Sequence, residues 1–482
     1  MKKILLVSSE AVPYVKTGGL ADVVGALPKY FDREQYDVRV VIPKYACMDS
    51  SFFSQLHFVC HFYVHLNWRK QYVGIFESEY KGIHFYFIDN EFYFAGPSPY
   101  NNIYEDVEKF AYFSKAVLES LPFIDFAPDI IHCNDWQTGL LPVYLKTVYG
   151  DDAFYAGIKT VYTIHNMQFQ GRWKLREVMD ITGLPERLFS ADKLESYGNA
   201  NYLKGGVVYS DIVTTVSPTY ANEIATVEGG EGLDGLMNSV KDHLYGIVNG
   251  IDYEEYNPQT DPYISVNFTK KDAIVGKKRN KAALQKELGL EVRDDVFMIG
   301  MVSRMTRQKG FDLIDFAMDE LLSKMDIQLV FLGSGERRYE DMIRYYEGKY
   351  PDKVRSYIGF DKRLSQMIYA SSDAILMPSL FEPCGLCQMI AMRYGTIPIV
   401  RETGGLKDTV EPYNEYENKG TGFSFANYNA HEMIFVMQYA YHIFKEQKKA
   451  WSALMERAMD KNFSWKSSIR SYEELYDKLC EI

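Results

Sequence analysis

Short apolar runs alternate with segments of helical period along most of the chain. In the first half the runs are Lys3–Ser8, Val38–Ile42, Ile130–Cys133, Thr160–Ile164 and Ile212–Val216. The helical segments among them are Ala21–Tyr30, Gln137–Tyr149 and Pro218–Ile224, and Tyr72–Asp89 predicts a hairpin. Apolar strands that alternate with helices are typical of a parallel sheet with crossover helices. The first half therefore predicts an α/β domain.

The second half repeats this alternation. Its predicted strands, each followed by a helix, are Phe297–Ser303, Gln328–Leu332, Val354–Ile358, Ala374–Met377 and Ile397–Val400. Residues 256–270 contain Pro258 and Pro262 but no strand pattern, which is typical of a linker. We therefore predict one domain over 1–250 and a second over 251–458. The helical, apolar segment 459–482 is predicted to return to the first domain.

Composition narrows the class of protein. The 482 residues are 47% hydrophobic and 24% charged, with a net charge of −12 and no Lys/Arg-rich block, which argues against a nucleic-acid partner. No stretch approaches the roughly 18 apolar residues of a membrane span. The apolar run near the N-terminus is too short for a signal peptide, and the six cysteines are scattered. We expect a cytoplasmic protein with no membrane partner.

One pattern with two adjacent glycines occurs in both halves. The sequence T-G-G-L-x-D-x-V follows the first predicted strand, where it contains Gly18 and Gly19, and returns with Gly404 and Gly405. Two glycines at the start of a helix let the backbone approach an anion, and Lys16 adds a charge beside the first pair. We interpret both turns as phosphate-binding. Twin helix starts without a ligand are the alternative.

Charged side chains follow two strands of the second half. Arg304 and Lys309 come after one strand, and Glu382 comes after another. Ligands bind at the carboxyl ends of parallel strands, where both cations could reach a diphosphate. A carboxylate would be repelled there and suits sugar hydroxyls instead. A solvated basic loop and a helix N-terminal acid are the alternative interpretations.

Polar residues also end strands of the first half. They are Asp135, His165 and Asn166. A metal site is not predicted: His57, His61 and His65 alternate along one strand, where residues four apart are separated by about 13 Å. The chain also lacks a D-x-D motif. Cationic side chains must then neutralise a diphosphate.

Cys384 and Cys387 form a C-x-x-C, for which we favour packing over a redox role.

At this point the chain resembles the bacterial glycogen synthases, which are similar to plant starch synthases, over nearly its full length. The resemblance is carried by K-T-G-G-L-A-D at 16–22, N-D-W at 134–136, T-I-H-N at 163–166, T-V-S-P-T-Y at 215–220, V-N-G at 248–250, the segment 304–310 and F-E-P-C-G-L at 381–386. It implies the GT-B fold, in which two Rossmann-like, doubly wound domains face each other across a cleft. It also implies metal-independent transfer from ADP-glucose to α-1,4-glucan with retention of configuration.

The resemblance also implies roles for individual residues. His165, Glu382, Arg304 and Lys309 would be catalytic, with Arg304 and Lys309 also binding the donor phosphates. The remaining donor-phosphate residues would be Lys16, Gly18, Gly19, Gly404 and Gly405, and the sugar and acceptor residues Asp22, Asp135, Asn166 and Asn249. ADP-glucose would be a co-substrate, with no other cofactor. The partners would be a nucleotide sugar and the glucan.

Alternatives remain at this level. The donor could be UDP-glucose, because base recognition leaves no clear trace in the sequence, or the chain could bind glucan without catalysis. A sucrose-type transferase of related fold would carry a second glutamate where Ile390 stands. A glucan phosphorylase would need a much longer chain and a pyridoxal lysine.

Overall fold

The computed structural model describes residues 1–481, which form two compact units. The first contains Met1–Asn249 together with the carboxyl-terminal residues from Trp465, and the second contains Gly250–Ser464. The sequence placed these divisions at 250 and 458. Within residues 1–481, no helix combines the length and the apolar character that crossing a bilayer requires.

The first unit is built on a nine-stranded sheet in the order β12-β11-β7-β6-β1-β2-β5-β4-β3. The strands are β1 (Lys2–Val7), β2 (Tyr36–Pro43), β3 (His57–Leu66), β4 (Arg69–Tyr80), β5 (Ile83–Asp89), β6 (Ile130–Asn134), β7 (Lys159–Ile164), β11 (Ile212–Thr215) and β12 (Leu244–Gly246). Neighbours from β12 to β5 are parallel, whereas β4 and β3 are antiparallel additions. The predicted hairpin is β4 with β5, and β3 lengthens it.

Helices cover this sheet, and a second, smaller sheet has the order β8-β10-β9. The longer helices are α1 (Gly19–Ala26), α4 (Ile103–Ser120), α5 (Leu140–Thr147), α6 (Leu175–Thr182), α7 (Tyr202–Tyr209) and α18 (Trp465–Glu481). The shorter elements are α2 (Ser50–Phe53), α3 (Glu91–Phe94), α8 (Pro218–Glu223), α9 (Asp234–Ser239), β8 (Arg172–Lys174), β9 (Glu195–Ser196) and β10 (Asn199–Asn201). The sequence did not predict α4, although eighteen residues and an Asn102 cap make it the longest of them.

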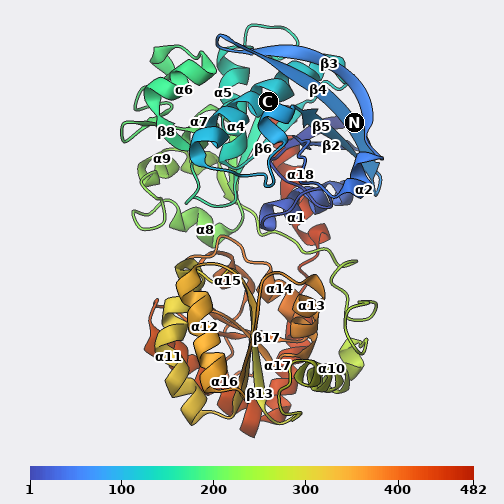
Figure 1. The fold of residues 1–482 in the computed structure, drawn as a ribbon, viewed down its shortest axis with the longest axis vertical. Helices are drawn as coiled ribbons and strands as arrows, with labels where there is room; N and C mark the ends of the chain where they lie inside the picture. The colour runs from blue at the N-terminus through green and yellow to red at the C-terminus, as the bar shows by residue number, and fades with distance from the viewer. Residues whose placement is uncertain (482) are drawn as a thin grey trace. The chain divides into compact units, whose positions relative to one another are not determined.

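The C-terminal helix α18 belongs to the first unit, although it is last in the sequence. In Figure 1 this red helix lies among the blue elements of the N-terminal sheet. Trp465 and Tyr476 on α18 are almost completely buried. The Tyr476 hydroxyl lies 2.6 Å from Nδ1 of His132 on β6, so the helix reaches the centre of the parallel sheet.

The second unit contains a six-stranded parallel sheet in the order β15-β14-β13-β16-β17-β18. Its strands are β13 (Phe297–Val302), β14 (Ile327–Gly333), β15 (Val354–Ile358), β16 (Ala374–Met377), β17 (Ile397–Arg401) and β18 (Phe423–Phe425). In sequence order this is 3-2-1-4-5-6, the arrangement of dinucleotide-binding sheets. The five predicted strands are present, and the short β18 was missed.

The helices of this unit are wound on both faces of the sheet. They are α10 (Ala273–Glu287), α11 (Phe311–Lys324), α12 (Arg337–Lys349), α13 (Lys362–Ser371), α14 (Cys387–Arg393), α15 (Gly404–Thr409), α16 (Ala430–Glu446) and α17 (Lys448–Asp460). In Figure 1, α11, α12 and α16 lie on one side of the sheet and α10, α13 and α14 on the other. The predicted linker is packed into this unit, because buried Asp261 accepts a hydrogen bond from the Tyr394 hydroxyl at 2.6 Å.

Each large sheet has one point at which the direction of winding reverses. In the first unit β2 lies on one side of β1 and β6 on the other, and in the second unit β14 and β16 flank β13 in the same way. Ligands of open α/β sheets bind outside the carboxyl ends of the strands at such a point. The loops that follow β1, β6, β13 and β16 are therefore where the chemistry of each unit is expected.

Candidate active site

The loop between β1 and α1 carries the first glycine pair. Gly18 has extended backbone and directly precedes the helix, which begins at Gly19. A Cβ built on Gly18 would meet only Oε1 of Glu10, at 3.8 Å, which is ordinary contact. Space beside this turn is therefore available to a ligand. We call this segment, Thr17 to Gly19, the open turn.

A buried carboxyl holds the open turn in place. Glu10 is 2% exposed, and its Oε2 accepts hydrogen bonds from the amide and the hydroxyl of Thr17, at 2.6 and 2.7 Å. Burial raises the pKa of Glu10 to about 7 against the lowering effect of these bonds. The sequence analysis missed Glu10. Its signal was an acidic residue three positions after the end of an apolar strand.

Lys16 and Asp22 flank the open turn and pair with each other. Their Nζ and Oδ1 atoms are 2.7 Å apart, and both side chains are partly exposed. Lys16 is therefore accessible to an anion, although the Asp22 carboxylate partly neutralises its charge. Such an exposed pair contributes little to stability.

Asp135 and His165 meet across β6 and β7. Asp135 accepts the backbone N–H of His165 at 2.7 Å and that of Asn166, and it adopts a positive φ of 56°. Burial raises the pKa of Asp135 to about 7, and repulsion by Glu10 acts in the same direction. The structure thus brings three sequence-predicted residues together, with Glu10 as an electrostatic neighbour.

The hydrogen bonds of His165 define its protonation. Asn134 donates its side-chain N–H to the carbonyl of Val7, so its Oδ1 is the acceptor that faces His165 Nε2 at 2.9 Å. Nε2 therefore carries the proton, and burial lowers the pKa of His165 to about 3. At neutral pH the ring is uncharged, with Nδ1 as a hydrogen-bond acceptor.

The remaining candidates of the first unit, Asn166 and Asn249, differ in whether their side-chain oxygens accept a hydrogen bond. Asn166 accepts the backbone N–H of Gln168 at 3.0 Å and so shapes the loop after β7. Asn249, shortly after β12, is 6% exposed, and its Oδ1 has no hydrogen-bond partner among the described residues. A buried amide oxygen without a partner costs free energy unless a ligand supplies a donor.

In the second unit, Lys309 and Glu382 form an ion pair. Lys309 Nζ lies 2.5 Å from Glu382 Oε2, and the carboxylate also accepts the Ser379 hydroxyl at 3.1 Å. Only 7% of the Glu382 side chain is exposed. These two residues follow β13 and β16, so the pair lies at the point where the winding of the sheet reverses. The sequence analysis assigned Lys309 to the diphosphate and Glu382 to sugar hydroxyls, but it did not predict that the two side chains are in contact.

Arg304, on the loop that follows β13, is exposed. Its guanidinium donates to Oε1 of Gln308 at 3.2 Å, a neutral partner that leaves its charge available. Phe360, two residues after β15, is 76% exposed and was not predicted as a site residue. An exposed aromatic ring at the carboxyl end of a parallel strand has a free face for stacking.

The second glycine pair has a different environment from the open turn. A Cβ on Gly404 would come within 2.0 Å of the Glu382 carbonyl oxygen, and one on Gly405 within 2.1 Å of the Cys384 carbonyl oxygen. The N–H of Gly405 already donates to the carbonyls of Glu382 and Pro383, at 3.1 Å each. We call Thr403 to Gly405 the closed turn. Its glycines allow close packing against the Glu382 loop, and the phosphate contacts predicted for them stay a prediction.

Metal and thiol chemistry receive no further support. Among residues 1–481, no group of three or more His, Cys, Asp or Glu side chains could hold a metal ion. Cys384 and Cys387 are not joined by a disulfide, and Cys387 donates to the Val302 carbonyl at 3.3 Å. These contacts fit the packing role that the sequence favoured.

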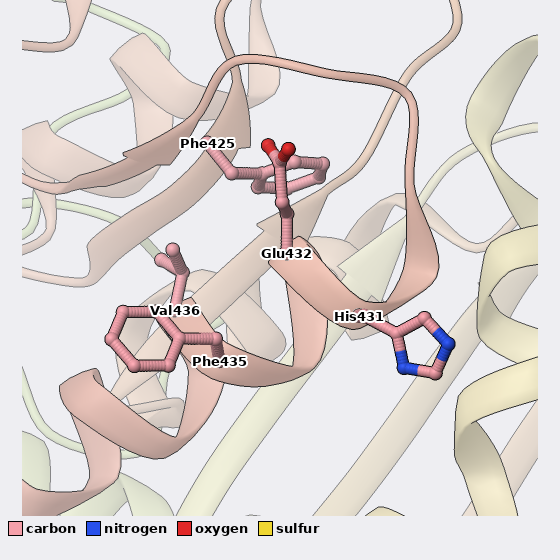
Figure 2. A pocket seen from close by; sticks show the side chains of 5 residues that line it. All are labelled: Phe425, His431, Glu432, Phe435 and Val436. Atoms are coloured by element: carbon pink, nitrogen blue, oxygen red, sulfur yellow. The ribbon is translucent and has the colours of Figure 1, made fainter.

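A surface hollow of about 370 Å³ in the second unit has no such chemistry. Figure 2 shows its lining, which comes from the end of β18 and the first turns of α16: Phe425, His431, Glu432, Phe435 and Val436. The Glu432 carboxylate is occupied by the backbone N–H and side-chain amide of Asn427, at 3.0 and 2.7 Å. None of the candidate site residues lines this hollow.

Comparison with known proteins identifies both units. Residues 3–239 match the family described as the starch synthase catalytic domain, and residues 280–451 match the glycosyl transferases group 1. Glycogen synthase from Lachnospira eligens is 60% identical over 99% of this chain and 100% of its own length. The catalytic domain of starch synthase IV from Arabidopsis thaliana, bound to ADP and acarbose, superimposes with a TM-score of 0.92 at 34% identity, covering 100% of this chain and 99% of that chain.

A more distant structure supports the fold alone. Sucrose-phosphate synthase from Thermosynechococcus elongatus covers all of this chain with a TM-score of 0.64 at 17% identity. The two Rossmann-like units are those of a GT-B glycosyltransferase, as the sequence predicted. The chain belongs to the family of glycogen and starch synthases.

Proposed function

We propose that this protein is a glycogen synthase-type hexosyltransferase. It transfers glucosyl units from ADP-glucose to the non-reducing end of an α-1,4-glucan and retains the anomeric configuration. Family membership over the whole chain supports this activity. The single structural observation that carries it is the Lys309–Glu382 pair at the carboxyl edge of the dinucleotide-type sheet. It places a cation for a diphosphate and an acceptor for sugar hydroxyls side by side.

The donor diphosphate requires positive charge at the bond that breaks. We assign Lys309 and Arg304 to the phosphates, with Lys16 and the open turn as the contribution of the first unit. Fixed cations and helix N–H groups stabilise the negative charge that develops on the leaving diphosphate. With this charge stabilised, the diphosphate itself can take the proton of the attacking glucan hydroxyl on the same face of the sugar, which retains the configuration.

The sugar requires groups that form hydrogen bonds with its hydroxyls. Glu382 accepts hydrogen bonds from hydroxyls of the donor glucose. His165 offers an unprotonated Nδ1 as an acceptor, because burial keeps its ring neutral. Asn249 offers a buried amide oxygen without a partner among the described residues. Asp22, Asp135 and Asn166 are assigned to the same sugar and acceptor region. A neutral histidine carries no positive charge that would attract the phosphates, and at Nδ1 it can only accept a hydrogen bond.

The test is a coupled assay of nucleotide release. Purified protein is incubated with glycogen and either ADP-glucose or UDP-glucose, and ADP and UDP are measured separately. Release of ADP that depends on glycogen, with label incorporated into the polymer, is the expected result. Preferential UDP release would replace the donor but keep the reaction class. No release from either donor would contradict catalysis and leave a glucan-binding protein.

A further inference from the structure

Glu10 is a buried carboxyl at the centre of the first unit to which the proposed reaction gives no role. It follows β1, the strand at which the winding of the sheet reverses. Both side-chain hydrogen bonds to Glu10 end on Oε2, which accepts the amide and the hydroxyl of Thr17. Among the described residues, Oε1 has no hydrogen-bond partner. One carboxyl oxygen is therefore committed to the open turn and the other is available.

The available oxygen lies beside the open turn. Oε1 is 3.8 Å from the position that a Cβ on Gly18 would occupy, and no other heavy atom lies within 4 Å of that position. The helix that begins at Gly19 presents its N-terminal N–H groups at the same turn. An anionic ligand that approaches the backbone of Gly18 would thus meet Oε1 directly.

The charges around Glu10 decide which protonation state suits such a ligand. The titratable groups that act on it or that it acts on, from every neighbouring loop, are Lys16, Asp22, Tyr45, Tyr100 and Asp135. The one cation in this set is already paired with Asp22, at 2.7 Å. An ionised Glu10 would therefore repel a phosphate oxygen in a buried site, where Coulomb repulsion is weakly screened.

We propose that Glu10 binds the donor diphosphate as a neutral carboxylic acid. Its Oε1 hydroxyl donates a hydrogen bond to a phosphate oxygen, while Oε2 holds Thr17 and keeps the turn in place. The proton belongs on Oε1 because Oε2 already accepts two hydrogen bonds. The inference rests on the proposed function, since the ligand is the diphosphate of the nucleotide sugar.

The protonation behaviour of Glu10 is consistent with this role. Burial raises the pKa of Glu10 to about 7; the negative charge of Asp22 acts in the same direction, and the hydrogen bonds from Thr17 and the charge of Lys16 oppose it. A bound diphosphate adds negative charge and moves the pKa in the same direction. At a pH above 7 the free protein would hold Glu10 mostly ionised and the complex would hold it protonated. Donor binding must then take up a proton from solution.

The decisive experiment is calorimetric titration of the full chain with ADP at pH 8, in buffers of different ionisation enthalpy. The wild type should take up about one proton per ADP bound. Glu10→Gln should bind ADP without this uptake, because its amide oxygen can accept from Thr17 while its N–H₂ donates to the phosphate. Asp135→Asn is the matched control, since Asp135 is the other carboxyl here whose pKa is raised to about 7, and it should retain the uptake.

Kinetics give a second readout. The KM of the wild type for ADP-glucose should rise about tenfold between pH 7 and 8.5, because only the protonated form binds well. For Glu10→Gln the KM should stay level over this range. Glu10→Ala should raise KM at every pH, because it removes both the donor and the support of Thr17.

The remaining outcomes separate the two proposals. If the wild type neither binds ADP nor releases it from ADP-glucose, the proposed function fails. If the wild type is active but ADP binding takes up no proton, or if Glu10→Gln takes up as much as the wild type, Glu10 is not the protonated donor. Loss of the uptake in Asp135→Asn alone would also overturn the assignment to Glu10. Should Glu10→Gln not fold, the wild-type uptake and pH dependence still decide.

Discussion

The pattern T-G-G-L-x-D-x-V begins a helix in both units, yet the two turns have opposite environments. Beside Gly18 there is room for a ligand, whereas Gly404 and Gly405 are pressed against the carbonyls of Glu382 and Cys384. The two turns also differ in their place in the sheet. The open turn follows β1, at the point of reversal, and the closed turn follows β17, two strands from β13. The comparison teaches that one sequence pattern can begin helices with different packing, because the neighbouring loops and not the motif set the space beside each turn.

The charged groups beside the two points of reversal differ as well. In the first unit they are mainly carboxyls, Glu10 and Asp135, together with the neutral His165. In the second unit a lysine pairs with the carboxylate of Glu382, and Arg304 stays accessible. The first set suits sugar hydroxyls, and a protonated Glu10 could also donate a hydrogen bond. The second suits phosphate charge.

Removing the cation that pairs with buried Glu382 should have the largest effect. Lys309→Met leaves the Glu382 carboxylate buried without its partner, so kcat should fall by roughly 10²–10³ and stability by about 3 kcal/mol. Urea unfolding and initial rates measure both effects. The double variant Lys309→Met/Glu382→Gln should recover stability but not activity. Recovery of activity would contradict the assignment of the pair to the reaction.

The exposed cation of the first unit is the counterpart. Lys16→Met should also lower kcat, by roughly 10², but its stability should change by less than about 0.5 kcal/mol because the pair with Asp22 is partly exposed. The same two measurements apply. A stability loss equal to that of Lys309→Met would remove this difference between the units.

The glycine pairs provide the most direct test of open against closed. Gly405→Ala should destabilise the protein by about 3 kcal/mol, since its Cβ would lie 2.1 Å from a backbone oxygen. Gly18→Ala should be neutral for stability but raise the KM for the donor about tenfold, because the methyl group enters ligand space. Unfolding curves and donor titrations distinguish the two. If both variants are equally destabilised, the first turn is not open.

A smaller effect is expected from the pH dependence of the first unit. Asp135 has a pKa of about 7 in the fold, well above its ordinary value, so it binds a proton more tightly when folded. Protonation of Asp135 therefore favours the folded state below about pH 4, and this contribution to the free energy of unfolding is lost as the pH rises to about 7. Asp135→Asn should gain about 1–2 kcal/mol relative to the wild type between pH 5 and 8. Parallel stability curves would show that Asp135 is not protonated in the fold.

The smallest expected effect is that of chelation. If Lys309, Arg304 and Lys16 supply the positive charge for the diphosphate, as proposed, EDTA should leave the initial rate of glucosyl transfer unchanged. The measurement compares rates with and without EDTA and added magnesium. Complete loss of activity that magnesium restores would mean that the cations of the two units do not suffice.

Several features could be predicted from the sequence because they depend on local pattern. Buried parallel strands are continuous apolar runs, so all ten predicted strands were found to within one or two residues at each end, from Lys3–Ser8 to Ile397–Val400. Polar residues at strand ends identified His165, Asp135, Lys309 and Glu382 as candidates. The short β12 and β18 were missed because three residues carry too little periodicity.

What the sequence by itself determined is therefore the set of strands, their polar ends and the family. Only the tertiary structure decided which of these residues meet. Three contacts show this. Lys309 pairs with Glu382, which is 73 residues away, and Glu10 accepts hydrogen bonds from Thr17, which is 7 residues away. Tyr476 of α18 contacts His132, which is 344 residues away. Burial likewise exists only in the fold, and it makes His165 neutral and raises the pKa values of Glu10 and Asp135. The two turns share one sequence pattern, but the segments packed around them leave space beside Gly18 and fill it beside Gly404 and Gly405.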